Sequence, residues 1–297
     1  MNDNQISQIA KLVTDFERWS VLPYEIYHYT DLNTIPKIVL KNAISLRMTK
    51  AEDLDDPHEG RHTIEVYYDL ALEQLLNDGI INKDLFHNLC TLEVPTELLY
   101  LFESSSAAFG KSAAYDTYIT CFSTQKNDPY MISNYIRNSE HKGYCISFYS
   151  DNVKENQSTF NTLSVRLCLE QVLYGNQIIK MLYDFIKRLV HIIPPDSEST
   201  EKWIKPLVLH GLSKLRYFVK LKRYYRENEV RLALMIPNNV DKSISYISPF
   251  TVKEEKGKKY IIVPFQRIIY AGMTQTASVT NEEDNRIRAI ISQNRIS

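Results

Sequence analysis

The spacing of hydrophobic residues changes several times along the chain, and each change predicts a new helix or strand. Near the N-terminus, apolar residues three or four positions apart predict a helix over residues 5–19, and Pro23 separates it from a strand over residues 25–29. Alternating or continuously apolar runs predict further strands over residues 43–48, 118–123, 144–148, 162–174, 229–235, 245–252, 259–263 and 267–271. Lys256-Gly257 predicts a hairpin turn near the end of the chain.

Helical spacing dominates several segments between these strands. The predicted helices cover residues 61–77, 84–90, 96–109, 177–193, 201–222 and 282–293. Most of them fall in two blocks, 61–110 and 175–222, which we interpret as helical insertions in a single domain spanning residues 1–297. The predicted fold class is therefore α+β, with a mixed or antiparallel central sheet.

The segment from Tyr118 to Phe148 places a strand, a helix and a second strand in about thirty residues. Asp128 can cap the helix, and Pro129 suits the first helical position, where an N–H has no partner in the helix. Ser123 ends the first strand, where a hydroxyl commonly caps the following loop. These residues therefore have an architectural explanation beside any chemical one.

Composition narrows the function classes. The 297 residues are 44% hydrophobic, which is enough for a substantial core, and the net charge is −1. Bulk charge thus does not imply a nucleic-acid partner. A basic patch at residues 214–226 could contact a phosphate backbone, although we favour a solvated helix face.

Cysteine usage and hydropathy predict a cytoplasmic protein. The four cysteines show no C-x-x-C spacing, which is typical of buried free thiols in a reducing compartment. The N-terminus lacks a basic region followed by an apolar one, and no apolar run approaches about eighteen residues. We therefore expect a cytoplasmic location and no membrane partner.

Three groups of residues share their order with a known bacterial family. They are Tyr27-His28-Tyr29-Thr30 with Asp55-Asp56-Pro57-His58-Glu59; Cys121-Phe122-Ser123 with Asn127 to Met131 and His141-Lys142-Gly143; and Glu227 to Arg231 with Ile269 to Gly272. In this order the chain resembles the bacterial domain of unknown function 2971 family. It departs from the family's pattern at Asp55, where asparagine is common, and at Ile132 and Tyr224, where tryptophan is common.

The same order looks like the layout of ADP-ribosyltransferase folds, particularly the DarT-like branch. That resemblance implies a transferase or NAD glycohydrolase that consumes NAD, of the kind found among bacterial phage-defence and toxin-type effectors. It implies a small-molecule dinucleotide, NAD, as substrate and leaves the acceptor open, with protein and nucleic acid among the alternatives. Departure of nicotinamide leaves an oxocarbenium-like ribose, whose positive charge a nearby carboxylate offsets.

The resemblance also implies roles for particular side chains. Glu229 would be the carboxylate at the ribose, and Glu227 would activate or orient the acceptor. Residues two apart on a strand share a face, so Arg231 is expected to project with them and to hold a carboxylate or a phosphate. The expected NAD-binding residues are His28, which would hydrogen-bond a ribose, Thr30, Ser123, and Tyr130 or Tyr135, one of which would stack on nicotinamide.

We expect Glu229 to be an exposed cleft carboxylate, so that Glu229→Gln removes NAD turnover and leaves the thermal midpoint nearly unchanged. Purely structural roles for Glu229 and His28 are the alternative to these catalytic and binding roles. A Glu-x-Glu-x-Arg pattern commonly forms a charge ladder on a solvated sheet, and a histidine between two tyrosines, such as His28, is commonly a satisfied core or edge residue. The alternative function is then a non-catalytic ligand-binding or sensing module, whose many tyrosines serve a ligand or partner surface.

A third hypothesis comes from His58-Glu59-Gly60-Arg61-His62, which satisfies the H-E-x-x-H pattern of zinc hydrolases. In that pattern two histidines on a helix bind zinc and the glutamate activates water. Pro57 and Gly60 place the motif at a helix start instead of a helix interior, which argues against a metal site.

The acidic cluster of Asp55, Asp56 and Glu59 has two interpretations. Adjacent carboxylates repel unless a cation or a helix N-terminus meets them. The cluster is therefore either a helix cap or a part of the site, and the sequence leaves both open.

Overall fold

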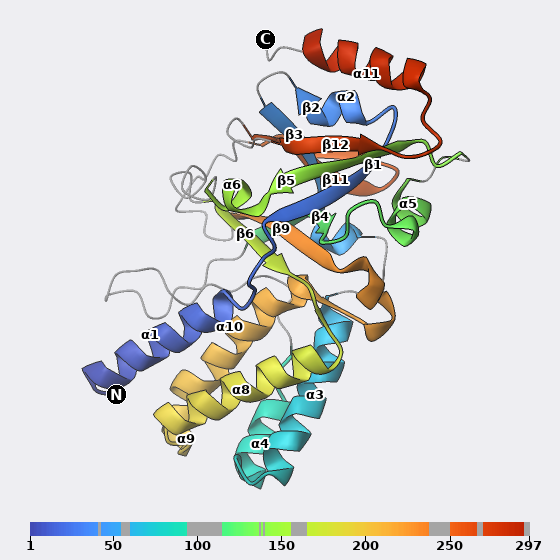
Figure 1. Ribbon diagram of the computed structural model, residues 1–297. Coiled ribbons are helices and arrows are strands. Elements are labelled where there is room, and N and C mark those ends of the chain that lie inside the picture. The colour runs from blue at the N-terminus through green and yellow to red at the C-terminus, as the bar shows by residue number, and fades with distance from the viewer. Residues whose placement is uncertain are drawn as a thin grey trace.

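The computed structural model describes residues 1–40, 43–54, 60–93, 115–136, 138, 140–155, 165–237, 250–265 and 270–293. These residues form a curled antiparallel β-sheet and, beside it, a layer of longer helices (Figure 1). The chain thus has mixed α and β structure, and the expected α+β class is confirmed at that level.

Within the described residues the main sheet has ten strands. They are β1 (Glu25–Asp31), β2 (Val39–Leu40), β3 (Ala43–Lys50), β4 (Tyr115–Ser123), β5 (Gly143–Tyr149), β6 (Arg166–Gln171), β9 (Glu229–Pro237), β10 (Lys253–Glu255), β11 (Lys258–Phe265) and β12 (Tyr270–Gln275). Each neighbouring pair in this sheet is antiparallel. A separate parallel pair consists of β7 (Leu173–Tyr174) and β8 (Val219–Lys220).

The sheet divides along β4. One edge of β4 pairs with β9 over its full length, from Tyr115 opposite Pro237 to Ser123 opposite Glu229. The other edge is therefore shared by β3, which pairs at Tyr118 and Ile119, and by β1, which pairs only at Ser123. Between these two contacts, residues 120–122 have no strand partner on that edge among the described residues. The strands on the β3 side of the sheet and those on the β1 side separate here, and β4 pairs with both sides.

The strand–helix–strand segment crosses over β1. Its strands β4 and β5 both pair with β1, which lies between them, and α5 (Pro129–Tyr135) connects them. As predicted, Asp128 caps α5 by accepting a hydrogen bond from the backbone N–H of Met131, and Pro129 occupies the first turn. The crossover places α5 beside the end of β1, where Tyr29 and Ile136 belong to one small apolar cluster.

The helical layer has a core of its own. Its elements are α1 (Asp3–Glu17), α3 (Arg61–Asn77), α4 (Lys83–Cys90), α8 (Asn176–Ile192), α9 (Ser197–Ser199), a π-helical turn at Thr200–Ile204 and α10 (Lys205–Leu215). Their apolar faces meet around buried residues such as Leu72, Leu182 and Leu212. Where they are described, the two blocks expected to be insertions therefore pack against each other and against the N-terminal helix (Figure 1).

Three further helices among the described residues cover other parts of the sheet. They are α2 (Ile35–Ile38), α6 (Ser150–Glu155) and α11 (Asn281–Gln293), together with the 3₁₀ turn η1 (Ala51–Asp53). Ile38 of α2, Val153 of α6 and Ile287 of α11 enter the apolar core of the sheet, which also contains alternate residues of β4 and β9.

The predicted helix over residues 201–222 is wrong in its second half. Helix α10 ends at Leu215, and the chain continues through the 3₁₀ turn η3 (Arg216–Phe218), strand β8 and the 3₁₀ turn η4 (Lys222–Glu227). Tyr217, Phe218 and Val219 are aromatic or β-branched and prefer extended backbone, and all three are buried. Of the predicted strand over 267–271, residues 267–269 lie outside the described residues, and Tyr270 and Ala271 belong to β12.

Several expectations fall outside the described residues. These are the helix over 96–109, most of the strand over 245–252, and the acidic cluster Asp55, Asp56 and Glu59. Among the described helices, none combines the length and the apolar composition that crossing a bilayer requires.

Candidate functional site

A cavity of about 100 Å³ lies beside the junction of β1 and β4, and we call it the β1–β4 cavity. Strand β1 contributes Tyr27, His28 and Tyr29, and strand β4 contributes Cys121, Phe122 and Ser123. The remaining lining residues are Met131 and Tyr135 of α5 and Glu229 of β9. His28 and Glu229, which are about two hundred positions apart in the sequence, thus line the same cavity, whereas Glu227 does not.

His28 fills the gap along the open edge of β4. Its ring nitrogen Nδ1 lies 2.9 Å from the carbonyl oxygen of Cys121, and because a carbonyl only accepts, Nδ1 carries the hydrogen. Burial lowers the pKa of His28 and outweighs the opposing effect of this hydrogen bond, so the ring is neutral near pH 7. The neutral ring therefore has Nε2 as an acceptor, which could bind a hydroxyl group.

Glu229 is held by two cations. Its Oε1 lies 2.7 Å from Nε of Arg231, and its Oε2 lies 3.3 Å from Nη2 of Arg231 and 2.8 Å from Nζ of Lys220. Arg231 also donates from Nη1 to the carbonyl oxygen of Tyr217, at 2.8 Å. Glu229 and Arg231 are only 2% and 1% exposed. The carboxylate is therefore fixed in one orientation by a bidentate, charge-assisted pair.

Glu227 approaches the same lysine from outside the strand. It is the last residue of η4, and Asn228 turns the chain into β9 with a φ of 42°. The Oε2 of Glu227 lies 2.6 Å from Nζ of Lys220, and its carboxyl group also hydrogen-bonds to the side chain of Tyr135. We call Lys220, Glu227, Glu229 and Arg231 the buried charge cluster.

The pKa values of the two carboxylates in this cluster shift in opposite directions. Burial alone would raise the pKa of Glu229, but the charges of Arg231 and Lys220 and hydrogen bonds from Arg231 and Cys121 hold it well below its usual range. Burial raises the pKa of Glu227, the charge of Glu229 adds to that effect, and Lys220 only partly opposes it. The cluster therefore contains one carboxylate that is firmly ionised and one that accepts a proton more easily.

The tyrosines around the cavity connect its walls. Tyr29 donates from its hydroxyl to the carbonyl of Gln125, at 2.6 Å, and accepts from the backbone N–H of Asp128, at 2.9 Å. These bonds fix the loop that leads to α5. Burial and a hydrogen bond to Glu25 raise the pKa of Tyr27 to about 12, so that its hydroxyl keeps its hydrogen near neutral pH.

Only some of the remaining predicted residues line the β1–β4 cavity. Tyr135 lines the cavity, whereas Tyr130, on the same helix, does not, and its ring centroid lies 5.0 Å from the guanidinium carbon of Arg226. Thr30 is buried and does not line the cavity. Ser123 lines it, but its hydroxyl donates to the carbonyl of Glu227 at 2.7 Å and accepts from the N–H of Gln125, as a loop-capping role predicts.

Three sequence-based interpretations need correction. The Glu-x-Glu-x-Arg residues do not form a solvated ladder and Glu229 is not exposed, because the sheet, η3 and β8 enclose them. Glu227 is not on a strand at all. The basic patch at residues 214–226 is not a solvated helix face, since Lys214, Arg216 and Lys220 are buried and only part of the patch, including Lys222 and Arg223, is exposed.

Sequence reasoning missed the contributions of Lys220, Cys121 and Tyr174. Lys220 was assigned to a helix surface. Cys121 was interpreted with the other cysteines as a buried free thiol, and it also lines the cavity and hydrogen-bonds to Glu229. Tyr174 accepts a hydrogen bond from the backbone N–H of Glu229 with its hydroxyl, at 3.0 Å. The available signal was that Lys220 directly follows two aromatic residues and a β-branched one, because such a segment favours a buried strand.

The zinc-hydrolase motif is not assembled within the described residues. Helix α3 begins at Arg61 with Gly60 as its N-cap, and His62 is exposed in its first turn. His58 and Glu59 lie outside the described residues. In the part of the chain that the structure describes, no group of three metal-binding side chains occurs.

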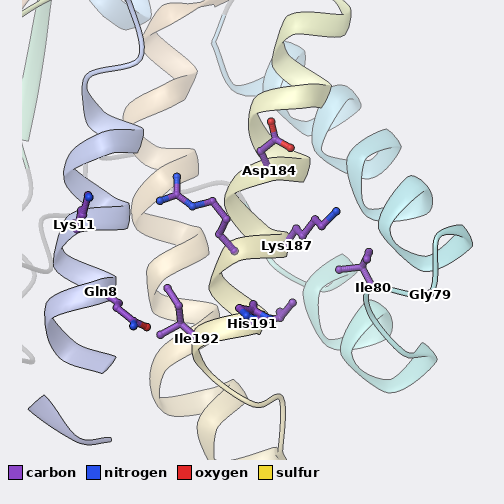
Figure 2. A pocket seen from close by; sticks show the side chains of 10 residues that line it. Gln8, Lys11, Gly79, Ile80, Asp184, Lys187, His191 and Ile192 are labelled. Carbon is purple, nitrogen blue, oxygen red and sulfur yellow. The ribbon is translucent and has the colours of Figure 1, made fainter. Parts of the chain in front are cut away.

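A second, larger groove of about 990 Å³ lies across α8 and reaches α1 and the turn between α3 and α4 (Figure 2). Lys11 and Lys187 line it together with Asp184, and Arg188 in its wall pairs with Asp15 at 3.4 Å. Its lining carries three cations and one anion, and Asp15 pairs with one of the cations. The C-terminus of α8, which lies at this groove, opposes the binding of an anion. We place the candidate site at the smaller cavity, where buried titratable groups converge.

Comparisons of the chain with protein-family models, curated proteins and solved structures found no match.

Proposed function

We propose that the β1–β4 cavity is the site of an NAD-consuming enzyme of the ADP-ribosyltransferase type, acting as a transferase or as an NAD glycohydrolase. The observation that carries this proposal is the convergence of His28, Tyr135 and Glu229 on one cavity. Cleavage of the bond to nicotinamide creates positive charge on the ribose, and Glu229 is a preorganised anion that could stabilise it. The resemblance to ADP-ribosyltransferase folds supports the same function.

The size of the cavity limits what enters it. Sites that hold a whole small-molecule ligand usually have about 300–1,000 Å³, whereas this cavity has about 100 Å³. One ring with part of its ribose is therefore the portion that fits, and the rest of the dinucleotide lies outside. The exposed guanidinium of Arg226, beside Tyr130 of α5, is available to a diphosphate there.

The acceptor positions of Glu229 indicate how a ribose hydroxyl would bind. A carboxylate has about four such positions. Arg231 and Lys220 supply three N–H contacts, and the thiol of Cys121 supplies a fourth, weaker hydrogen bond. A hydroxyl group that enters the cavity would replace the thiol. The Nε2 atom of His28 offers a second acceptor for the sugar.

The second candidate function is a binding or sensing module without turnover. The observation that favours it is the close pairing of Glu229 with Arg231 and Lys220, because a neutralised carboxylate stabilises a developing cation less than a free one. Such a module would bind the ring in the same cavity and release it unchanged.

One experiment separates the two candidates. The purified protein is incubated with NAD labelled in the nicotinamide ring, and both release and binding of the label are followed. Release above a protein-free control supports the enzyme, whereas saturable binding of intact NAD supports the module. If neither release nor binding occurs, both proposals are wrong.

The two tyrosines of α5 provide a matched pair of variants. We expect Tyr135→Phe to slow nicotinamide release by about 10- to 150-fold, since it removes a hydrogen bond to a charged group worth about 1.5–3 kcal/mol. Tyr130→Phe removes the same atom outside the cavity and should leave the rate near that of the wild type. Equal rates for both variants would remove Tyr135 from the mechanism.

A further inference from the structure

Lys220 is a buried lysine whose ammonium group contacts two glutamates. It belongs to the two-residue strand β8 and is only 6% exposed, with its Nζ within 2.8 Å of both Glu227 and Glu229. A buried lysine is rare unless it is paired, and here one ammonium group faces two carboxylates that come from different elements.

The surroundings of Glu227 show why this cation matters. Glu229 faces it from β9 as a like charge, and the hydroxyl groups of Tyr135 from α5 and Tyr174 from β7 are close to it. Arg231, also on β9, is engaged by Glu229 and by the carbonyl of Tyr217. The other cations of η4 are Lys222, Arg223 and Arg226, whose side chains are exposed. Lys220 is thus the described cation at ion-pair distance from Glu227.

We propose that Lys220 is the positioning residue of this site: its ammonium group holds Glu227 and Glu229 side by side and allows both to be ionised together. Two carboxylates that share a buried site do not both ionise unless a cation lies between them. With Lys220 present, Glu227 remains a base that can accept a proton through Tyr135, which lines the cavity, while Glu229 remains an anion. This inference rests on the proposed function only where enzyme activity is concerned.

The first test measures protonation directly and needs no substrate. Infrared spectra of the folded protein, recorded as a function of pH, show the carbonyl band of a protonated glutamic acid. In the variant Lys220→Met we expect this band to appear at a pH about 1 to 3 units higher than in the wild type, because one opposite charge has been removed. The band should be absent from the double variant Lys220→Met/Glu227→Gln, which assigns it to Glu227.

Control variants separate charge from packing. Lys220→Arg keeps the charge and should keep the infrared titration close to that of the wild type. Lys222→Met removes an exposed lysine two residues away and should change nothing. If Lys220→Met does not fold, the double variant is compared with Glu227→Gln alone, and the carbonyl band that is followed is then that of Glu229, which also pairs with Lys220. We expect this band at higher pH in the double variant, and identical titrations would overturn the proposal.

The second test uses activity. If nicotinamide release occurs, the acid limb of its pH profile should move to higher pH in Lys220→Met by the same amount as the infrared band. A folded Lys220→Met protein with an unchanged infrared titration would overturn the proposal. Absence of nicotinamide release from the wild type would refute the proposed function alone, because the infrared result does not depend on turnover.

Discussion

Replacing Glu229 with glutamine should lower the free energy of unfolding by about 3–5 kcal/mol, the usual effect of removing one partner from a buried ion pair. The substitution leaves the guanidinium of Arg231 buried against a neutral amide, whose NH₂ group cannot accept its hydrogen bonds. Denaturant unfolding, followed by circular dichroism and by the fluorescence of Trp19 and Trp203, measures the change. This expectation replaces the one from sequence, in which an exposed Glu229 contributed little to stability.

Glu227→Gln is the matched control. Both substitutions neutralise a carboxylate of the same cluster, but the raised pKa of Glu227 means that the folded protein already favours its neutral form more than the unfolded chain does. We expect a clearly smaller loss of stability than for Glu229→Gln. Equal losses for the two variants would contradict the opposite pKa directions.

The dependence of stability on pH follows from the direction of the pKa shift of Glu229. The pKa of Glu229 is lower in the folded protein than in the unfolded chain, where it is about 4.3. Its contribution to stability is therefore fully present above that pH and is lost as the pH falls further, towards the folded-state pKa. The variant Glu229→Gln should lack this part of the acid-induced loss, so the wild type and the variant should converge in stability at low pH.

Much of the local structure follows from the sequence because the deciding residues are neighbours in the chain. Asp128 and Pro129 fix the start of α5 through the cap and the first helical position. Lys256 and Gly257 form the turn between β10 and β11, both with positive φ. Helix α3 covers the residues that the apolar spacing predicted, Arg61–Asn77.

The sheet topology could not be predicted in the same way. The division of the sheet at β4 depends on which strands pair across long separations, and alternation along one strand carries no information about its partner. The length of α10 was misjudged for a related reason. Tyr217 and Phe218 leave the helix because they fill the space beneath β4 and β9, and that tertiary packing overrides helical spacing.

At the candidate site, the placement of some residues could be predicted from the sequence, whereas their electrostatics could not. The resemblance placed eight residues at one site. Four of them, His28, Ser123, Tyr135 and Glu229, line the same cavity, whereas Glu227, Thr30, Tyr130 and Arg231 do not. The resemblance could not supply the electrostatics, because the state of Glu229 depends on Lys220, whose segment was assigned to a helix surface. Burial and pairing of charges are properties of the assembled sheet, and the five residues from Glu227 to Arg231 do not encode them alone.

Gly143 is the other position where we expect a large effect, because β5 approaches β1 there without space for a side chain. A Cβ atom at Gly143 would lie 2.3 Å from the carbonyl oxygen of Thr30 and 2.9 Å from Cδ1 of Ile136. The first contact is with backbone, which cannot rotate away as the end of a flexible side chain can. Gly143→Ala must therefore displace either β1 or the end of α5.

We expect Gly143→Ala to destabilise the protein by about 1–3 kcal/mol, the usual range for overpacking, and to disturb the cavity as well. Ile136 directly follows Tyr135, so a shift of Ile136 moves the tyrosine that connects the cavity to Glu227. Denaturant unfolding measures the first effect, and the accessibility of Cys121 to a small thiol reagent measures the second.

Gly272→Ala is the control, since a Cβ atom there meets no atom within 4 Å and the residue has no positive φ. That variant should be as stable as the wild type or more stable by up to about 1 kcal/mol, because alanine restricts the unfolded chain. The close approach of β5 to β1 would have no energetic consequence if the two alanine variants unfolded at the same denaturant concentration.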